Sequence, residues 1–132
     1  IISFRSYTYT GFNEAGNWLR ENAEDDAIIY TDSTRAIRIF SLIDFYENGG
    51  RLKGPEKTKD GFEKQLDDEK NDVYLIYDVW EAIQPSWMYP MDDNKLNYIT
   101  GLGFQMVKIV NKQVPTENGL QEVPVVVIFK RL

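Results

Sequence analysis

The chain contains no cysteine and no histidine among its 132 residues. Without cysteine, disulfide bonds, thiolate catalysis and cysteine-based zinc sites are excluded. Without histidine, the sequence lacks the commonest general base at neutral pH and the commonest ligand of transition metals. A Ser-His-Asp or Cys-His mechanism cannot be built from this chain, whereas carboxylate chemistry and a carboxylate-bound hard cation are not excluded.

Positive charge and long hydrophobic runs are also scarce. The 15 Lys and Arg residues against 21 Asp and Glu residues give a formal net charge of −6, which argues against nucleic acid or anionic lipid as a partner. No run approaches the roughly 20 apolar residues of a membrane span, and no signal peptide is visible. The chain begins inside apolar sequence at Ile1, without an initiator Met. We therefore expect residues 1–132 to form one soluble α/β domain cut from a larger membrane protein.

The hydrophobic pattern predicts alternating strands and helices in the first half of the chain. Residues 1–10 are typical of a strand, and the spacing of Phe12, Ala15 and Leu19 predicts an amphipathic helix after it. Residues 27–30 form a short apolar run that is typical of a strand covered on both faces. The later predicted elements are a helix over 34–47, a short surface helix around Phe62 and Leu66, a strand over 73–77, a helix beginning at Asp92 or Asp93, and a hairpin of 104–110 and 123–129 joined by a long loop.

This order of elements predicts the fold class. Helices alternate with strands early, and an antiparallel hairpin closes the chain. We expect an α/β fold, a three-layer sandwich with a mixed sheet, early β-α-β units and a C-terminal antiparallel hairpin.

Polar residues follow the apolar strand over 27–30 directly. Thr31, Asp32, Ser33 and Thr34 would lie at its carboxyl end, where ligands bind in open α/β sheets. One interpretation is an anion or sugar-phosphate site at a helix N-terminus. The other, which we favour, is a helix cap, because Asp, Ser and Thr all cap well and no glycine-rich loop accompanies them.

Asp78 follows the second apolar strand, much as Asp32 follows the first. Both acids end parallel-looking strands, so they are expected near one another on one edge of the sheet. Paired carboxylates can bind a divalent cation or transfer protons. Acids at strand ends commonly have no such role, and we favour that interpretation and assign no catalytic residue, metal or cofactor.

Aromatic residues are most dense between the second strand and the next helix. Trp80, Trp87 and Tyr89 suit a carbohydrate-stacking or partner-docking surface, or a patch beside a membrane. The alternative is a loop folded back over the core, its path determined by Pro85 and Pro90. We favour the folded-back loop.

Two separated motifs carry a family resemblance. The first is the helix segment Trp18-Leu19-Arg20-Glu21-Asn22, preceded by Ala15, and the second is the closing hairpin. Together they resemble the extracytoplasmic C-terminal domain of prokaryotic, possibly archaeal, multi-spanning membrane glycosyltransferases of the protein-mannosyltransferase and GT-C type. The hairpin residues that match are Gly103, Phe104, Val107, Val127, Ile128, Phe129 and Lys130.

The helix-strand unit is also distantly similar to the one that carries the Trp-Trp-Asp-Tyr-Gly motif in oligosaccharyltransferase catalytic subunits. The matching segment here runs from Tyr30 to Thr34 and retains only Asp32 of that motif. In such transferases the catalytic acid lies in the membrane-embedded half, which this segment does not include. The resemblance therefore implies a non-catalytic domain of a glycosyltransferase that uses a lipid-linked sugar donor.

The resemblance also implies a place and partners for this domain. It would lie on the extracytoplasmic side of the cell membrane, against the membrane-embedded half of its own polypeptide, and shape access of a glycan or protein acceptor or dock a partner. The alternative is a module that binds a small molecule or sugar phosphate through Thr31, Asp32, Ser33, Thr34 and Asp78. A carboxylate-based hydrolase is the least favoured hypothesis, because no catalytic motif supports it.

Overall fold

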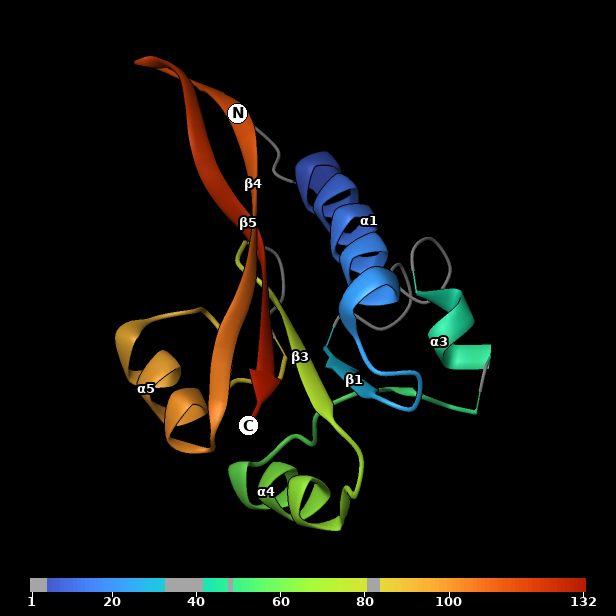
Figure 1. Cartoon of the computed structure of the whole chain (residues 1–132). Helices are drawn as coiled ribbons and strands as arrows, with labels where there is room; N and C mark the ends of the chain where they lie inside the picture. The colour runs from blue at the N-terminus through green and yellow to red at the C-terminus, as the bar shows by residue number, and fades with distance from the viewer. Residues whose placement is uncertain (1–4, 33–41, 48, 81–83) are drawn as a thin grey trace.

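The computed structural model describes residues 5–32, 42–47, 49–80 and 84–132, with side chains from residue 10 onward (Figure 1). The elements in chain order are α1 (Arg5–Asn22), β1 (Ile28–Thr31), α3 (Ile43–Glu47), β2 (Leu52–Lys53), α4 (Lys59–Asp68), β3 (Val73–Asp78), α5 (Asp93–Gly101), β4 (Phe104–Thr116) and β5 (Gly119–Arg131). Among these residues no helix has the length and apolar character needed to cross a membrane.

The strands form one mixed sheet in the order β2-β1-β3-β5-β4. β1 pairs in parallel with β2 and with β3, with Ile29 opposite Leu52 on one side and Tyr74 on the other. β5 is antiparallel to both β3 and β4 and therefore lies between them. The expected α/β fold with a mixed sheet and a C-terminal antiparallel hairpin is confirmed.

Helices cover both faces of this sheet, which gives three layers (Figure 1). Alternating residues along each strand point to opposite faces, so Ile29 and Ile76 pack under α1 and α3, whereas Tyr30 and Leu75 pack under α4 and α5. All six residues of β3 are buried, as expected for a central strand with helices on both faces. Each large apolar side chain buried in this way contributes about 1.5–3 kcal/mol to stability.

The predicted strand over residues 1–10 is wrong, because helix α1 already includes Arg5. The helical spacing of Phe12, Ala15 and Leu19 continues into a longer helix that packs on the hairpin. Gly11 permits this packing, because a Cβ added there would lie only 2.7 Å from a methyl carbon of Val125 in β5. The contacts that α1 makes with the hairpin from Gly11 onward thus favour a helix where the local pattern predicts a strand.

The middle of the chain follows its predicted pattern more closely. Phe62 and Leu66 are buried on α4, and the Thr58 hydroxyl caps this helix by accepting from the Gly61 amide at 3.0 Å. Asp92 is the N-cap of α5, accepting from the Lys95 amide at 2.9 Å. The two-residue strand β2 is not predicted, and most of the predicted helix over 34–47 lies outside the described residues.

The closing hairpin differs from the prediction in its length. β4 ends at Thr116 and β5 begins at Gly119, so a two-residue turn replaces the expected long loop. Gly119 has a φ of +94°, a conformation that favours glycine at such a turn. Pro115 is tolerated within β4 because this strand lies at the edge of the sheet. The hairpin consequently projects beyond the other strands (Figure 1).

Candidate functional site

The carboxyl ends of β1 and β3 are linked by one phenol, that of Tyr89. The parallel register sets Thr31 opposite Ile76, which brings the two strand ends together. The Tyr89 hydroxyl donates to Asp32 Oδ1 at 2.7 Å and accepts from the backbone N–H of Asp78 at 3.2 Å. The structure therefore brings Asp32 and Asp78 to one edge of the sheet, on either side of a shared tyrosine.

The Asp78 side chain has a structural task at this edge. It is only 2% exposed, and its Oδ1 accepts from the backbone N–H of Trp80 at 2.9 Å, which closes a turn directly after β3. The Trp80 indole N–H then donates to the carbonyl of Pro124 in β5 at 2.6 Å. Asp78 and Trp80 thus mark the point where β3 stops pairing with β5.

The tyrosines at this edge remain protonated at neutral pH. Burial raises the pKa of Tyr89 well above its usual value, and the nearby Asp32 carboxylate raises it further. Burial likewise raises the pKa of Tyr77, whose hydroxyl donates to the carbonyl of Met88. These phenols act as hydrogen-bond donors, and the raised pKa values make them unsuited to act as bases.

Thr31 lies at the same strand end but faces the other way. Ile29, two residues earlier, packs in the core under α1, so strand alternation directs Thr31 to that face as well. Its hydroxyl is fully buried and has no hydrogen-bond partner in the part of the chain that the structure describes. Ser33 and Thr34, the other predicted residues of this site, lie outside the described residues.

A cavity of about 420 Å³ lies beside Asp32. That volume falls within the range of small-molecule sites, about 300–1,000 Å³. The cavity is lined by Asp32, Gly54, Pro55, Lys57, Gln84 and Pro85.

The wall that carries Lys57 is held in place by α4 and by Trp87. The Gln65 side chain donates to the Gly54 carbonyl at 3.1 Å and accepts from the Glu56 amide at 2.9 Å. The Trp87 indole donates to the Glu56 carbonyl at 2.9 Å. Because the loop is anchored at both of these residues, the cavity wall is organised before any ligand arrives.

Lys57 and Gln84 are functional candidates that the sequence did not indicate. Lys57 belongs to a run of mixed charges whose pattern is typical of a solvated face. Only the pairing of β2 with β1 brings this loop to the carboxyl edge of the sheet. The Gly54-Pro55 break was the one local signal of a loop at this position.

The predicted aromatic surface divides into two parts. Trp87 and Tyr89 are buried, so the surface interpretation is wrong for both: Trp87 packs on Phe62 with ring centroids 4.8 Å apart, and Tyr89 packs on Tyr77 at the same separation. Trp80 is 47% exposed and stays available to solvent. Residues 87–89 therefore fit the interpretation of a loop folded back over the core, whereas the exposed Trp80 does not.

The described residues offer no ready metal centre. They contain no group of three or more His, Cys, Asp or Glu side chains arranged to hold an ion. Asp32 is hydrogen-bonded to Tyr89, and Asp78 closes the turn at Trp80. The predicted carboxylate pair is thus arranged around a phenol, with both acids in hydrogen-bonding roles.

A second cavity of about 400 Å³ lies at the opposite edge, near the start of β3, and residues 69–73 and Arg131 line part of it. Ligands of open α/β sheets bind outside the carboxyl ends of the strands, which favours the cavity beside Asp32.

Searches of protein-family models, curated proteins and solved structures find no match to this chain.

Proposed function

We propose that this chain is a non-catalytic binding module for a sugar or sugar phosphate, with its site at the carboxyl ends of β1 and β3. The observation that carries this proposal is the 420 Å³ cavity beside an Asp32 carboxylate that Tyr89 holds in place. A fixed carboxylate accepts from sugar hydroxyls, and an amide such as that of Gln84 can donate and accept. Pro55 and Pro85 supply apolar surface for a sugar ring.

Lys57 favours an anionic group on the ligand. It forms no ion pair with any residue that the structure describes, and it lines the same cavity as Asp32. An ammonium group at the wall of a cavity is a common phosphate ligand. Because the chain lacks histidine and cysteine and its edge tyrosines stay protonated, binding without turnover is the activity these residues support.

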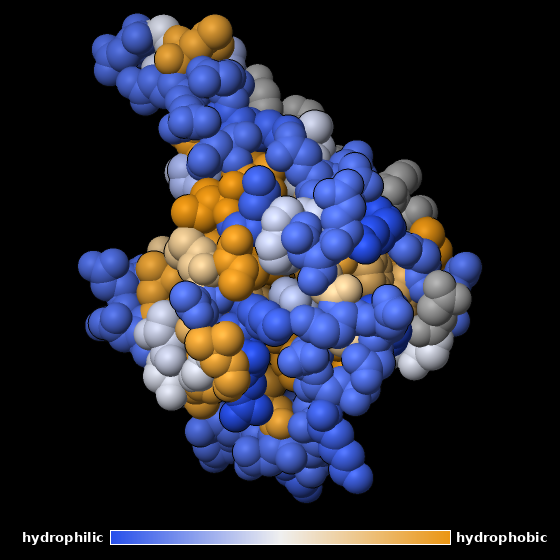
Figure 2. All heavy atoms as spheres, viewed as in Figure 1, coloured by the Kyte–Doolittle hydropathy of each residue, from blue (hydrophilic) through white to orange (hydrophobic). Residues whose placement is uncertain are grey.

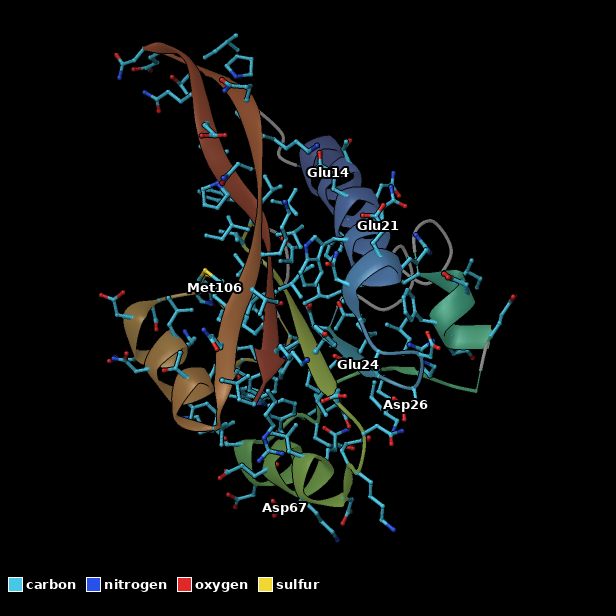
Figure 3. The ribbon with its side chains drawn as sticks, viewed as in Figure 1. Glu14, Glu21, Glu24, Asp26, Asp67 and Met106 are labelled. Atoms are coloured by element: carbon cyan, nitrogen blue, oxygen red, sulfur yellow. The ribbon has the colours of Figure 1, made fainter. Side chains whose placement is uncertain are left out.

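Calorimetric titration with mannose, mannose 6-phosphate and glucose 1-phosphate tests this proposal. We expect saturable binding of at least one sugar phosphate, with Asp32→Asn and Lys57→Met each weakening it about tenfold or more. Asp67→Asn is the matched control, because Asp67 lies exposed on α4 (Figure 3) and is not among the residues that line the cavity. Silence across the three ligands, or equal affinity in wild type and Asp32→Asn, would refute the proposal.

We further propose that the module belongs to the extracytoplasmic side of a membrane glycosyltransferase, where it contacts the membrane-embedded half of its own polypeptide and presents a glycan or protein acceptor. One observation favours this context: the two motifs that carry the family resemblance pack against each other. Leu19 of α1 and Ile128 of β5 share one core, and Lys130 forms an ion pair at 2.6 Å with Glu24, two residues after the first motif.

The full reading frame and a topology reporter test the membrane context. We expect the full reading frame to encode several membrane spans before residue 1. When alkaline phosphatase is fused after Leu132 of this full polypeptide and expressed in bacteria, we expect it to be active, because it would then lie on the extracytoplasmic side. A reading frame without such spans would reject the membrane context and leave the sugar-binding proposal standing. The two proposals therefore fail separately.

A further inference from the structure

Strand β4 forms an outer edge of the sheet over 13 residues. It pairs with β5 on one side, and no strand in the described ranges pairs with its other side. Figure 1 shows β4 as the outermost strand on its side of the sheet, and α1 packs on the face of the hairpin that carries Val110. An edge of this kind presents backbone N–H and C=O groups that a further strand can bind.

The middle of this edge is apolar and exposed. Met106, Val107 and Ile109 are 42%, 37% and 43% exposed, and we call these three residues the β4 strip. Figure 2 shows hydrophobic residues gathered over this part of β4, and Figure 3 shows Met106 projecting on the side away from α1. The register shifts between Met106 and Lys108, so Val107 is an extra residue that opposes no partner on β5.

The charge of β4 differs in sign from that of the whole chain. The strand carries Lys108 and Lys112 and no acidic residue, although the formal net charge of the chain is −6. Lys112 forms an ion pair with Glu14 of α1. Lys108 forms no ion pair with any described residue, and strand pairing sets it beside Ile128 on the opposite face from Ile109.

We propose that β4 binds an extended segment of a partner protein as a sixth strand, and that this segment alternates apolar with acidic residues. Its apolar side chains would lie beside Met106 and Ile109 on one face, and its acidic side chains beside Lys108 on the other. A second copy of this chain fits less well. Antiparallel pairing of two β4 edges centred on the strip would set the two Lys108 side chains against each other.

Fluorescence polarisation with two labelled peptides tests the proposal. One peptide has the sequence Glu-Val-Glu-Ile-Glu-Val-Glu, and the other has lysine at each glutamate position. We expect saturable binding of the acidic peptide and at least tenfold weaker binding of the basic one. Lys108→Glu should weaken the acidic peptide about tenfold, since an attractive cross-strand pair becomes repulsive.

Lys64→Glu is the matched control, because it makes the same charge change at an exposed position on α4. We expect this variant to bind the acidic peptide as wild type does. Ile109→Thr should weaken both peptides, which separates the apolar contribution from charge. Three outcomes would overturn the proposal: no saturable binding, equal losses in Lys108→Glu and Lys64→Glu, or a concentration-dependent dimer in light scattering that Ile109→Thr abolishes.

Discussion

Replacing Tyr89 with phenylalanine removes the hydroxyl that links the ends of β1 and β3. The substitution keeps the ring packed on Tyr77 and deletes only the oxygen that contacts Asp32 and the Asp78 amide. Loss of a hydrogen bond to a charged group costs about 1.5–3 kcal/mol, and an unsatisfied buried amide costs about 1–3 kcal/mol. We therefore expect Tyr89→Phe to lower the free energy of unfolding by about 2.5–6 kcal/mol.

Urea denaturation followed by circular dichroism measures this loss. The midpoint should fall while the slope with denaturant stays unchanged, because the substitution alters no buried apolar area. Tyr98→Phe is the matched control: its hydroxyl donates to Glu63 at 3.1 Å in a partly exposed setting, where we expect a loss below about 1 kcal/mol. If both variants lose the same small amount, below about 0.5 kcal/mol, the bridging role of Tyr89 is refuted.

Three further predictions concern packing, pH and exposure. Gly11→Ala should lower the melting temperature, because its Cβ meets a β5 methyl carbon at 2.7 Å and such overpacking costs about 1–3 kcal/mol, whereas Gly101→Ala, with open space around it, should not. The Arg20 guanidinium holds the pKa of Asp44 below its usual value, so the stability from this pair is complete above about pH 5 and is lost as the pH falls further. The thermal stabilities of wild type and Asp44→Asn should therefore converge between about pH 5 and pH 2. Iodide should quench the fluorescence of the exposed Trp80 and leave most of the remaining tryptophan fluorescence. If a Trp80→Phe variant is quenched as much as wild type, the exposure of Trp80 is contradicted.

The sequence predicts the fold well where the pattern of neighbouring residues in a segment agrees with the way that segment packs in the structure. β3 is a run of apolar residues that becomes a fully buried central strand, and Phe62 and Leu66 are the buried positions of α4. Asp92 caps α5 as its position before that helix predicts. In each case the periodicity and the cap are properties of neighbouring residues, so a single segment contains the signal.

The errors arise where distant contacts decide the outcome. Helix α1, which replaces the predicted first strand, packs on a hairpin more than a hundred residues later, with Gly11 against Val125. The cavity wall at Lys57 and Gln84 depends on β2 pairing with β1 and on Gln65 and Trp87 anchoring the loop. No local pattern contains such information, and Asp32 alone of the cavity-lining residues was a candidate from the sequence.

The position of β5 has a consequence for how this protein assembles. β5 follows β4 in the chain, yet it lies between β3 and β4 in the sheet. During synthesis on a ribosome, β3 and β4 therefore have no shared neighbour until the last strand has emerged. A nascent chain that stops before Gly119 would expose the edge of β3 and lack the β5 residues that both core layers share, so the domain should gain protease resistance in a single late step.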